Sequence, residues 1–294
     1  MRKIRIATVS FEIVNGGASV EDNLERIALY AEQAQRAHAD LLCLPETVTT
    51  MATNTPHRSD DGTWQRFFSG LAAQHSMAII APFLMQKDDG LVNQASIFDK
   101  EGRLIGSYEK LQPTGDEAKR IVPGSKLEVF DLGFARVAMM ICMDIYFPEI
   151  ARIYALKGAE ILFWPTMTHG PSQEALREQA SVRAMDNSLV LVEANYAQQQ
   201  PYAPYAGRIY PGNARVFDHN GDVIAQTGRR PGIAVAEIDL DEIRKTANCF
   251  LIDPEIDDTR RDIEQLVRLD LYSREYAALA KSQHQFYDEL HKKK

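Results

Sequence analysis

The sequence predicts an α/β fold built as one large domain, and three observations lead to this prediction. Strand-like and helix-like segments alternate along the chain, no low-complexity linker divides it, and two segments with the pattern of β-hairpins resemble each other. The 294 residues are 45% hydrophobic and 25% charged, which is typical of a globular protein. A chain of this length can bury an extensive core, so it needs neither disulfides nor a structural metal.

The first half alternates between short apolar strands and amphipathic helices. Its first helix is expected to begin at Ser19, because Leu24, Ile27 and Ala31 follow at helical spacing. The expected elements, in chain order, are a strand over 2–9, a helix from Ser19, a strand over 41–44, a helix around 64–71, a strand over 77–84, and a hairpin of 95–98 and 104–108.

The second half repeats this alternation. Proline suits the first turn of a helix and glycine suits its end, so a helix is expected from Pro148 to Gly158. The other expected elements are strands over 129–132, 135–141, 161–164 and 189–195, a helix over 172–186, a hairpin of 214–217 and 223–226, and a charged helical tail from Asp257 onward.

The two predicted hairpins indicate an internal duplication of one α/β unit. ASIFDKEGRLIG at 95–106 resembles ARVFDHNGDVIA at 214–225, and the strand at 3–11 resembles the segment at 135–143. The alternative is that Asp-x-x-Gly turns are common in any hairpin, and the sequence leaves this alternative open.

Charge and motif content argue against several classes of function. The formal net charge of -8 disfavours a nucleic acid partner. No P-loop, dinucleotide fingerprint or metal-binding histidine motif is present, so no cofactor and no metal are expected. The N-terminus resembles a strand and not a signal peptide, and no apolar run approaches the ~18 residues of a membrane span. A cytoplasmic protein without a membrane partner is therefore expected.

Cys142 is the first candidate for chemistry because it follows an apolar strand, and the strand ends of open α/β sheets are where catalytic groups collect. A single cysteine in such a run is more often a buried structural thiol, which is the expectation for Cys43 and Cys249. A nucleophilic cysteine also needs a base and a group that stabilises an oxyanion.

Three charged residues lie where predicted strands give way to loops. Glu46 follows the strand at 41–44, Lys110 follows the strand at 104–108, and Glu117 lies in the loop after Lys110. Each of them alone would be an ordinary surface charge. Together they supply a base, a cation and a second carboxylate.

These residues lie in motifs that resemble the nitrilase superfamily of carbon–nitrogen hydrolases. The motifs are CLPE at 43–46, YEKLQPTGDE at 108–117 and ICMDIYFPE at 141–149, and VRAMDNSLVLVEAN and GNARVFDHNGDVIAQTG continue the similarity. The resemblance implies an αββα four-layer sandwich with an internal pseudo-twofold. We therefore expect a hydrolase domain over 1–256 and a helical extension over 257–294 that takes part in oligomerisation.

The resemblance also implies a role for each motif residue. Cys142 is the expected nucleophile, Glu46 its general base, and Glu117 a carboxylate that orients Lys110 or the substrate. Lys110 and the backbone N–H of Met143 are expected to stabilise the oxyanion. The expected intermediate is a thioester on the cysteine.

The motifs give conflicting indications about the substrate. Met143 and Asp144 stand where true nitrilases usually have tryptophan and glutamate, which favours an amide or N-carbamoyl substrate. KLQPTGDE resembles the nitrilase form of the lysine motif and favours a nitrile. We expect an amidase, with a nitrilase as the alternative. Two further hypotheses are a catalytically silent binding module and a cysteine–histidine hydrolase that uses His169.

Residues near the ends of neighbouring strands are candidates for the substrate pocket, although core packing is the alternative for the aromatic ones. The candidates are Met143, Tyr146, Trp164, Thr168, His169 and Tyr196. The stretch 198–210 is a candidate loop over the site. The expected partners are a small amide, carbamoyl or nitrile substrate and further copies of this chain in a homodimer or larger homo-oligomer.

Overall fold

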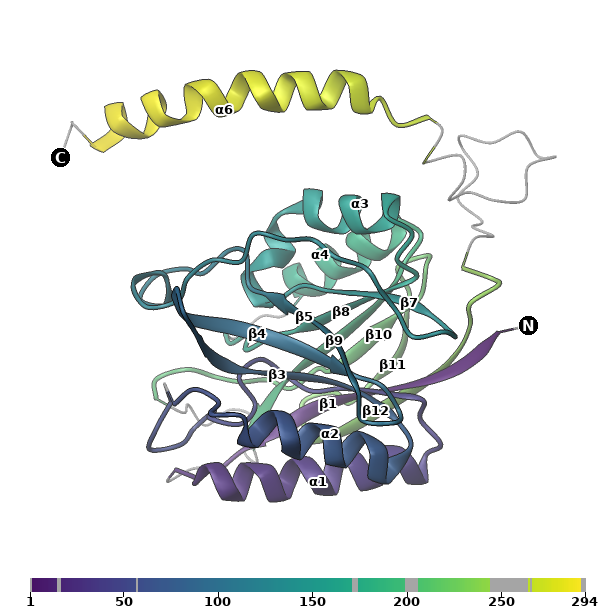
Figure 1. Cartoon of the computed structure of the whole chain (residues 1–294). Helices are drawn as coiled ribbons and strands as arrows, with labels where there is room; N and C mark the ends of the chain where they lie inside the picture. Colours follow the sequence, from purple (N-terminus) through teal and green to yellow (C-terminus); the bar gives the residue numbers. More distant parts are fainter. Residues whose placement is uncertain are drawn as a thin grey trace.

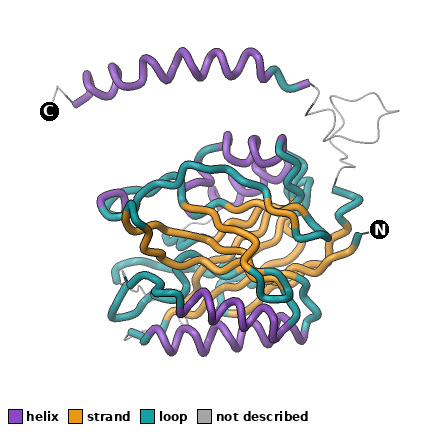
Figure 2. Tube along the Cα trace, in the orientation of Figure 1, coloured by secondary structure: helices purple, strands orange, loops and turns teal. Residues whose placement is uncertain are grey.

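Two β-sheets pack face to face in the computed structural model, and helices cover their outer faces (Figure 1). Helices α1 (Val20–Arg36) and α2 (Thr63–His75) lie on one side, and α3 (Pro148–Leu156) and α4 (Glu174–Met185) lie on the other. Figure 2 shows the same separation of outer helices from inner strands. The predicted αββα architecture is therefore confirmed. The structure describes residues 2–14, 17–56, 58–170, 174–198, 206–243, 264 and 266–291.

The first sheet has the strand order β12-β1-β2-β3-β4-β5. Strands β1, β2 and β3 are parallel, whereas β4, β5 and β12 are antiparallel to their neighbours. The strands are β1 (Lys3–Ile13), β2 (Leu41–Cys43), β3 (Ala78–Lys87), β4 (Gly90–Phe98), β5 (Leu104–Glu109) and β12 (Gly232–Asp239).

The second sheet has the order β6-β7-β8-β9-β10-β11 and repeats the first strand by strand. Strands β7, β8 and β9 are parallel, their neighbours are antiparallel, and α3 and α4 occupy the connections that α1 and α2 occupy in the first unit. This repetition confirms the internal duplication. The strands are β6 (Phe130–Asp131), β7 (Arg136–Met139), β8 (Ile161–Pro165), β9 (Val190–Gln198), β10 (Arg215–Phe217) and β11 (Val223–Gln226).

Strand β1 joins the two sheets, because Ser10–Ile13 pair in parallel with Asn195–Gln198 of β9. Two apolar clusters hold the layers together. One combines residues of both sheets with α3 and α4, and the other packs α1 and α2 against the first sheet. Burial of this apolar surface is the main force that fixes the relative position of the strand ends.

Local sequence signals determine where the helices and hairpin turns begin. The Ser19 hydroxyl accepts the Asp22 N–H at 3.0 Å and the Asp22 carboxylate accepts the Ser19 N–H at 2.7 Å, which is a capping box. The carboxylates of Asp99 and Asp218 accept N–H groups two residues further on in the two hairpin turns. The predicted helix start and turns are therefore confirmed.

The structure differs from the prediction just before Cys142. The expected strand over 135–141 ends at Met139, because the chain leaves the sheet and turns into the short 3-10 helix η2 (Cys142–Tyr146). A second 3-10 helix, η1 (Glu117–Lys119), begins at the carboxylate predicted to orient Lys110.

The tail contains the helix α6 (Leu269–His291), which lies outside α3 (Figure 1). Residues 257–263 of the predicted tail lie outside the described residues. In the part of the chain that the structure describes, no helix combines the length and the apolar character that crossing a membrane requires.

Candidate active site

Cys142 occupies a strained position at the end of a parallel strand. Its φ of 48° lies in the left-handed region, which is uncommon for a residue with a side chain and is typical of functional sites. Trp164 holds this conformation by donating its indole N–H to the Cys142 carbonyl at 2.9 Å. The turn therefore presents a partly exposed cysteine next to the carboxyl end of β8.

Asp144 ties this turn to the segment that carries Lys110. Its carboxylate accepts the Tyr108 hydroxyl at 2.6 Å, the Ile141 N–H at 2.9 Å and the Gln112 N–H at 3.0 Å. Tyr108 and Gln112 flank Lys110 in the chain, so one buried carboxylate fixes both the cysteine turn and the exit of β5. Burial raises the pKa of Asp144 to about 6, although the hydrogen bonds and Lys110 act to lower it.

Glu46 lies just after β2 and is 2% exposed. Its Oε1 accepts hydrogen bonds from the Lys110 ammonium and the Asn93 amide, both at 2.8 Å. Its Oε2 is buried and has no hydrogen-bond partner in the described residues. The Tyr196 hydroxyl donates to the Glu46 carbonyl at 2.5 Å, which fixes the backbone. A buried carboxylate oxygen without a partner can accept a proton from a neighbouring group.

Lys110 is almost completely buried and bridges two carboxylates. Its ammonium lies 2.8 Å from Glu46 Oε1 and 2.7 Å from Glu117 Oε2. Burial opposes the charged form, but the carboxylates of Glu46 and Glu117 outweigh burial and hold the pKa of Lys110 well above its ordinary value. The lysine is therefore a permanent cation and not a proton acceptor.

The thiol of Cys142 is kept protonated. Burial and the charge of Glu46 together raise its pKa to about 12, although Lys110 and hydrogen bonds with Thr166 and the Met167 backbone act to lower it. A thiol in this state becomes a nucleophile only when a base removes its proton.

A cavity of about 570 Å³ brings the predicted catalytic side chains together. Its lining includes Glu46, Asn93, Lys110, Glu117 and Cys142. This volume accommodates a small molecule. In the described residues, no group of three or more His, Cys, Asp or Glu side chains is arranged to hold a metal ion.

Two of the six predicted pocket residues, Met143 and His169, line this cavity. Burial and the charge of Arg208, which also lines the cavity, lower the pKa of His169. No hydrogen bond between His169 and Cys142 is found in the described part of the chain, so the hypothesis of a cysteine–histidine pair has no contact to support it.

The other four predicted pocket residues are not part of the cavity lining. Trp164 and Tyr196 are fully buried and hold the backbones of Cys142 and Glu46 from behind. Thr168 bonds Thr166 at 2.6 Å. Tyr146 is 50% exposed outside the cavity. The prediction placed these side chains only near strand ends, and a position near a strand end does not determine the face to which a side chain points.

Asn93, Thr166, Met167 and Arg208 were not among the sequence candidates for the site. The strand VNQASIF gives a signal for Asn93, because a polar residue interrupts an apolar strand that pairs on both edges. Residues 199–205 of the predicted covering loop lie outside the described residues.

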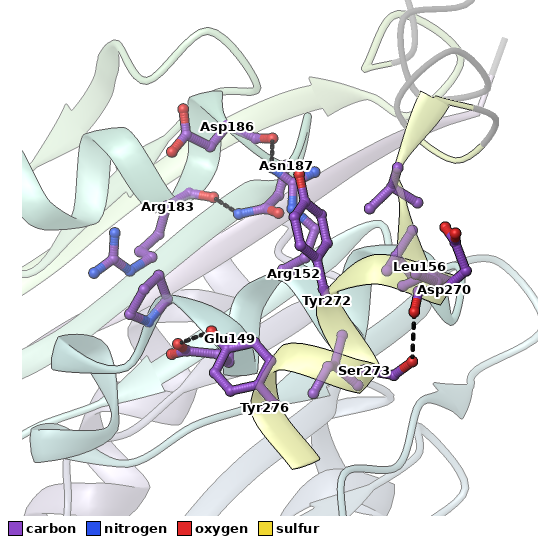
Figure 3. A pocket seen from close by; sticks show the side chains of 14 residues that line it. Glu149, Arg152, Leu156, Arg183, Asp186, Asn187, Asp270, Tyr272, Ser273 and Tyr276 are labelled. Atoms are coloured by element: carbon purple, nitrogen blue, oxygen red, sulfur yellow. Dashed lines mark hydrogen bonds between the residues drawn. The ribbon is translucent and has the colours of Figure 1, made fainter. Parts of the chain in front are cut away.

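A larger cavity, of about 710 Å³, lies between α6 and the pair α3 and α4 (Figure 3). Its walls are largely apolar, with Tyr272 and Tyr276 of α6 facing Glu149 and Arg152 of α3. It contains no cysteine and no buried lysine–carboxylate cluster among its described lining residues. The side chains predicted to be catalytic therefore lie in the smaller cavity.

A sequence model described as carbon-nitrogen hydrolase matches residues 5–248. This chain belongs to the carbon–nitrogen hydrolase family. A 2-oxoglutaramate amidase of Bacillus subtilis is 31% identical over 272 residues, which cover 89% of this chain and 99% of the relative. A human omega-amidase is 27% identical over 83% of this chain and 91% of the relative.

Solved structures show the same fold. An amidase from Nesterenkonia sp. has a TM-score of 0.72 at 24% identity, with 83% of this chain and 93% of that chain covered. A mutant of that amidase in complex with butyramide has a TM-score of 0.70 at 22% identity, with 83% and 94% covered. These comparisons confirm the predicted family and enzyme class, and they favour an amidase over a nitrilase.

Proposed function

We propose that this carbon–nitrogen hydrolase cleaves a small primary amide that carries a carboxylate, through a thioester on Cys142. The observation that supports this proposal is the buried Glu46 Oε2, which has no partner among the described residues and belongs to the same cavity as Cys142 and the cationic Lys110. Such an arrangement supplies the base, the cation and the nucleophile that acyl transfer requires.

Each step of the proposed reaction uses these groups. Glu46 takes the proton of the Cys142 thiol as sulfur forms a bond to the amide carbon, and the oxyanion is stabilised by Lys110 and the N–H of Met143. The N–H groups in the first turn of a helix have no partner within the helix, and Met143 is the second residue of η2 and lines the cavity.

The tetrahedral intermediate then loses ammonia. Its carbon–nitrogen bond breaks, and Glu46 returns its proton to the departing nitrogen. Glu46 next removes a proton from water, and the resulting hydroxide attacks the thioester carbon. The carbon–sulfur bond then breaks as Glu46 returns that proton to the sulfur, which releases the carboxylic acid and restores the thiol. Glu117 holds the Lys110 ammonium throughout.

Arg208 is the proposed partner of the substrate carboxylate. It lines the cavity, and no ion pair to it is found among the described residues. One relative is named as a 2-oxoglutaramate amidase, and 2-oxoglutaramate is a primary amide that carries a carboxylate. A guanidinium is well suited to a carboxylate because it donates two parallel hydrogen bonds.

The test is ammonia release from 2-oxoglutaramate, from a neutral amide such as butyramide, and from a nitrile of similar size. We expect turnover of the amides, greater efficiency with 2-oxoglutaramate, and no turnover by Cys142→Ala. The variant Arg208→Met should raise KM for 2-oxoglutaramate about tenfold or more and leave KM for butyramide unchanged. Nitrile turnover without amide turnover, or full activity of Cys142→Ala, would refute the proposal.

We also infer that the C-terminal extension and α3 form an interface with a second copy of the chain. The α6 side chains Leu269, Tyr272, Tyr276 and Leu279 are each about half exposed or more, and the Tyr276 hydroxyl contacts Glu149 at 2.6 Å beside the larger cavity (Figure 3). Such a surface is typical of an interface. Light scattering after chromatography should give a dimer or larger oligomer for the full chain and a monomer for residues 1–256.

The proposed compartment is the cytoplasm. The chain has three cysteines, and Cys43 and Cys142 are free thiols in the structure, which fits a reducing environment. Fractionation of cells that produce the tagged chain tests this assignment.

A further inference from the structure

Asn93 lies between the two carboxylates of the site. It is on β4, is 1% exposed and lines the cavity. Its Nδ2 donates to Glu46 Oε1 at 2.8 Å and to Glu117 Oε1 at 2.9 Å. An ionised carboxylate only accepts hydrogen bonds, so both contacts require the nitrogen end of the amide and fix the orientation of the Asn93 side chain.

The four polar side chains form a closed ring. Lys110 and Asn93 each donate to both Glu46 and Glu117, so each carboxylate is held from two directions. The Lys110 N–H also donates to the Asn93 carbonyl at 2.9 Å, which fixes the two donors to each other through the backbone.

This ring distinguishes the two oxygens of Glu46. Both donors use Oε1, and Oε2 has no partner in the part of the chain that the structure describes. Lys110 alone could hold a carboxylate that still rotates about its last torsion, because the ammonium is a point charge. A second donor from another direction restricts that rotation and leaves one defined oxygen for proton transfer.

We propose that Asn93 is a positioning residue that locks the Glu46 carboxylate so that Oε2 serves as the proton acceptor for Cys142. The inference depends on the proposed amide hydrolysis at this site. Asn93 also stabilises the two ionised carboxylates, because hydrogen bonds to a charged form favour that form. The other ionisable groups around Glu46 are Lys110, Cys142 and Tyr196.

The test compares Asn93→Leu with Gln94→Leu, a matched loss of a buried amide on the same strand. Gln94 donates to Ser96 at 2.8 Å, and adjacent residues of a strand point to opposite faces. We expect Asn93→Leu to lower kcat for the amide by about tenfold to hundredfold with KM within about threefold. The acid limb of its profile of kcat/KM against pH should move to higher pH. Gln94→Leu should keep the wild-type kcat and the wild-type acid limb.

A second variant keeps the test decisive if Asn93→Leu does not fold. Asn93→Ser retains one donor, and it should give an intermediate loss of kcat and a smaller displacement of the acid limb. A folded Asn93 variant with wild-type kcat and an unshifted acid limb overturns the inference. Absence of amide turnover by the wild-type protein instead refutes the proposed function, so the two failures are distinguishable.

Discussion

The substitution Glu46→Gln should have opposite effects on two reactions of Cys142. Burial and the charge of Glu46 raise the pKa of the thiol and Lys110 lowers it, so removal of the carboxylate charge leaves only burial to oppose the effect of the lysine. The pKa of Cys142 therefore falls, and more thiolate is present at neutral pH. The same substitution removes the proposed general base of the enzymatic reaction.

The magnitude follows from the pKa of about 12 for Cys142. At pH 7 such a thiol is ionised in about one molecule in 10⁵, compared with about 3% for an ordinary cysteine. Each unit by which the pKa falls raises the thiolate fraction about tenfold. Because a less basic thiolate is also a weaker nucleophile, alkylation should accelerate about threefold per unit. Turnover should fall by about 10²- to 10⁴-fold.

Intact-mass measurement of iodoacetamide adducts at pH 7 gives the alkylation rate, and ammonia release gives the turnover. Cys142→Ala shows which adduct belongs to this thiol. Asp116→Asn is the matched carboxylate control, because Asp116 borders the same cavity but its side chain is 88% exposed. Asp116→Asn should change neither rate. Slower alkylation of Glu46→Gln than of the wild type, or retained turnover, would refute the reasoning.

Three further substitutions test the contacts around the site. Lys110→Met leaves the buried carboxylate of Glu46 and the partly buried carboxylate of Glu117 without their cation. It should lower the free energy of unfolding by about 3–5 kcal/mol, measured by urea denaturation, together with loss of turnover. Asp144→Asn replaces a carboxylate that accepts three hydrogen bonds, so it should lower the free energy of unfolding by about 1–3 kcal/mol in the same assay and also lower kcat. An unchanged kcat would contradict a role of Asp144 in fixing the Cys142 turn. Tyr196→Phe removes the donor to the Glu46 carbonyl and should lower the free energy of unfolding by about 1 kcal/mol, with a modest loss of kcat. A change in KM alone would instead indicate that Tyr196 contacts the substrate.

Local signals were sufficient to predict the elements and the α/β class because they agree with the tertiary arrangement, whereas the four-layer sandwich was predicted from the resemblance to the nitrilase superfamily. The capping pair at Ser19 and Asp22 and the turns at Asp99 and Asp218 are fixed by residues a few positions apart. Such short-range bonds can be predicted from the chain alone. The charged motifs, through their resemblance to the family pattern, also predicted that Glu46, Lys110, Glu117 and Cys142 lie together, and in the structure all four line one cavity.

The inner contacts of the site could not be predicted in the same way. Asn93 contacts Glu46 across two neighbouring strands, and this contact depends on the register of β4 in the sheet. Trp164 and Tyr196 were expected in the pocket, but both side chains point behind it. Face and register depend on packing between distant segments, which a single sequence does not fix.

The duplicated unit explains why the proposed nucleophile lies at the strand end of the second unit. When the strand at 3–11 is aligned with 135–143, Ser10 corresponds to Cys142. In the first unit β1 continues straight to Ile13, and Ser10 is fully buried because this part of the strand pairs with β9. In the second unit β7 ends at Met139, and Cys142 turns out of the sheet with a φ of 48°. The pairing that joins the two sheets therefore closes one of the two equivalent strand ends, and it leaves the other free to reach the cavity.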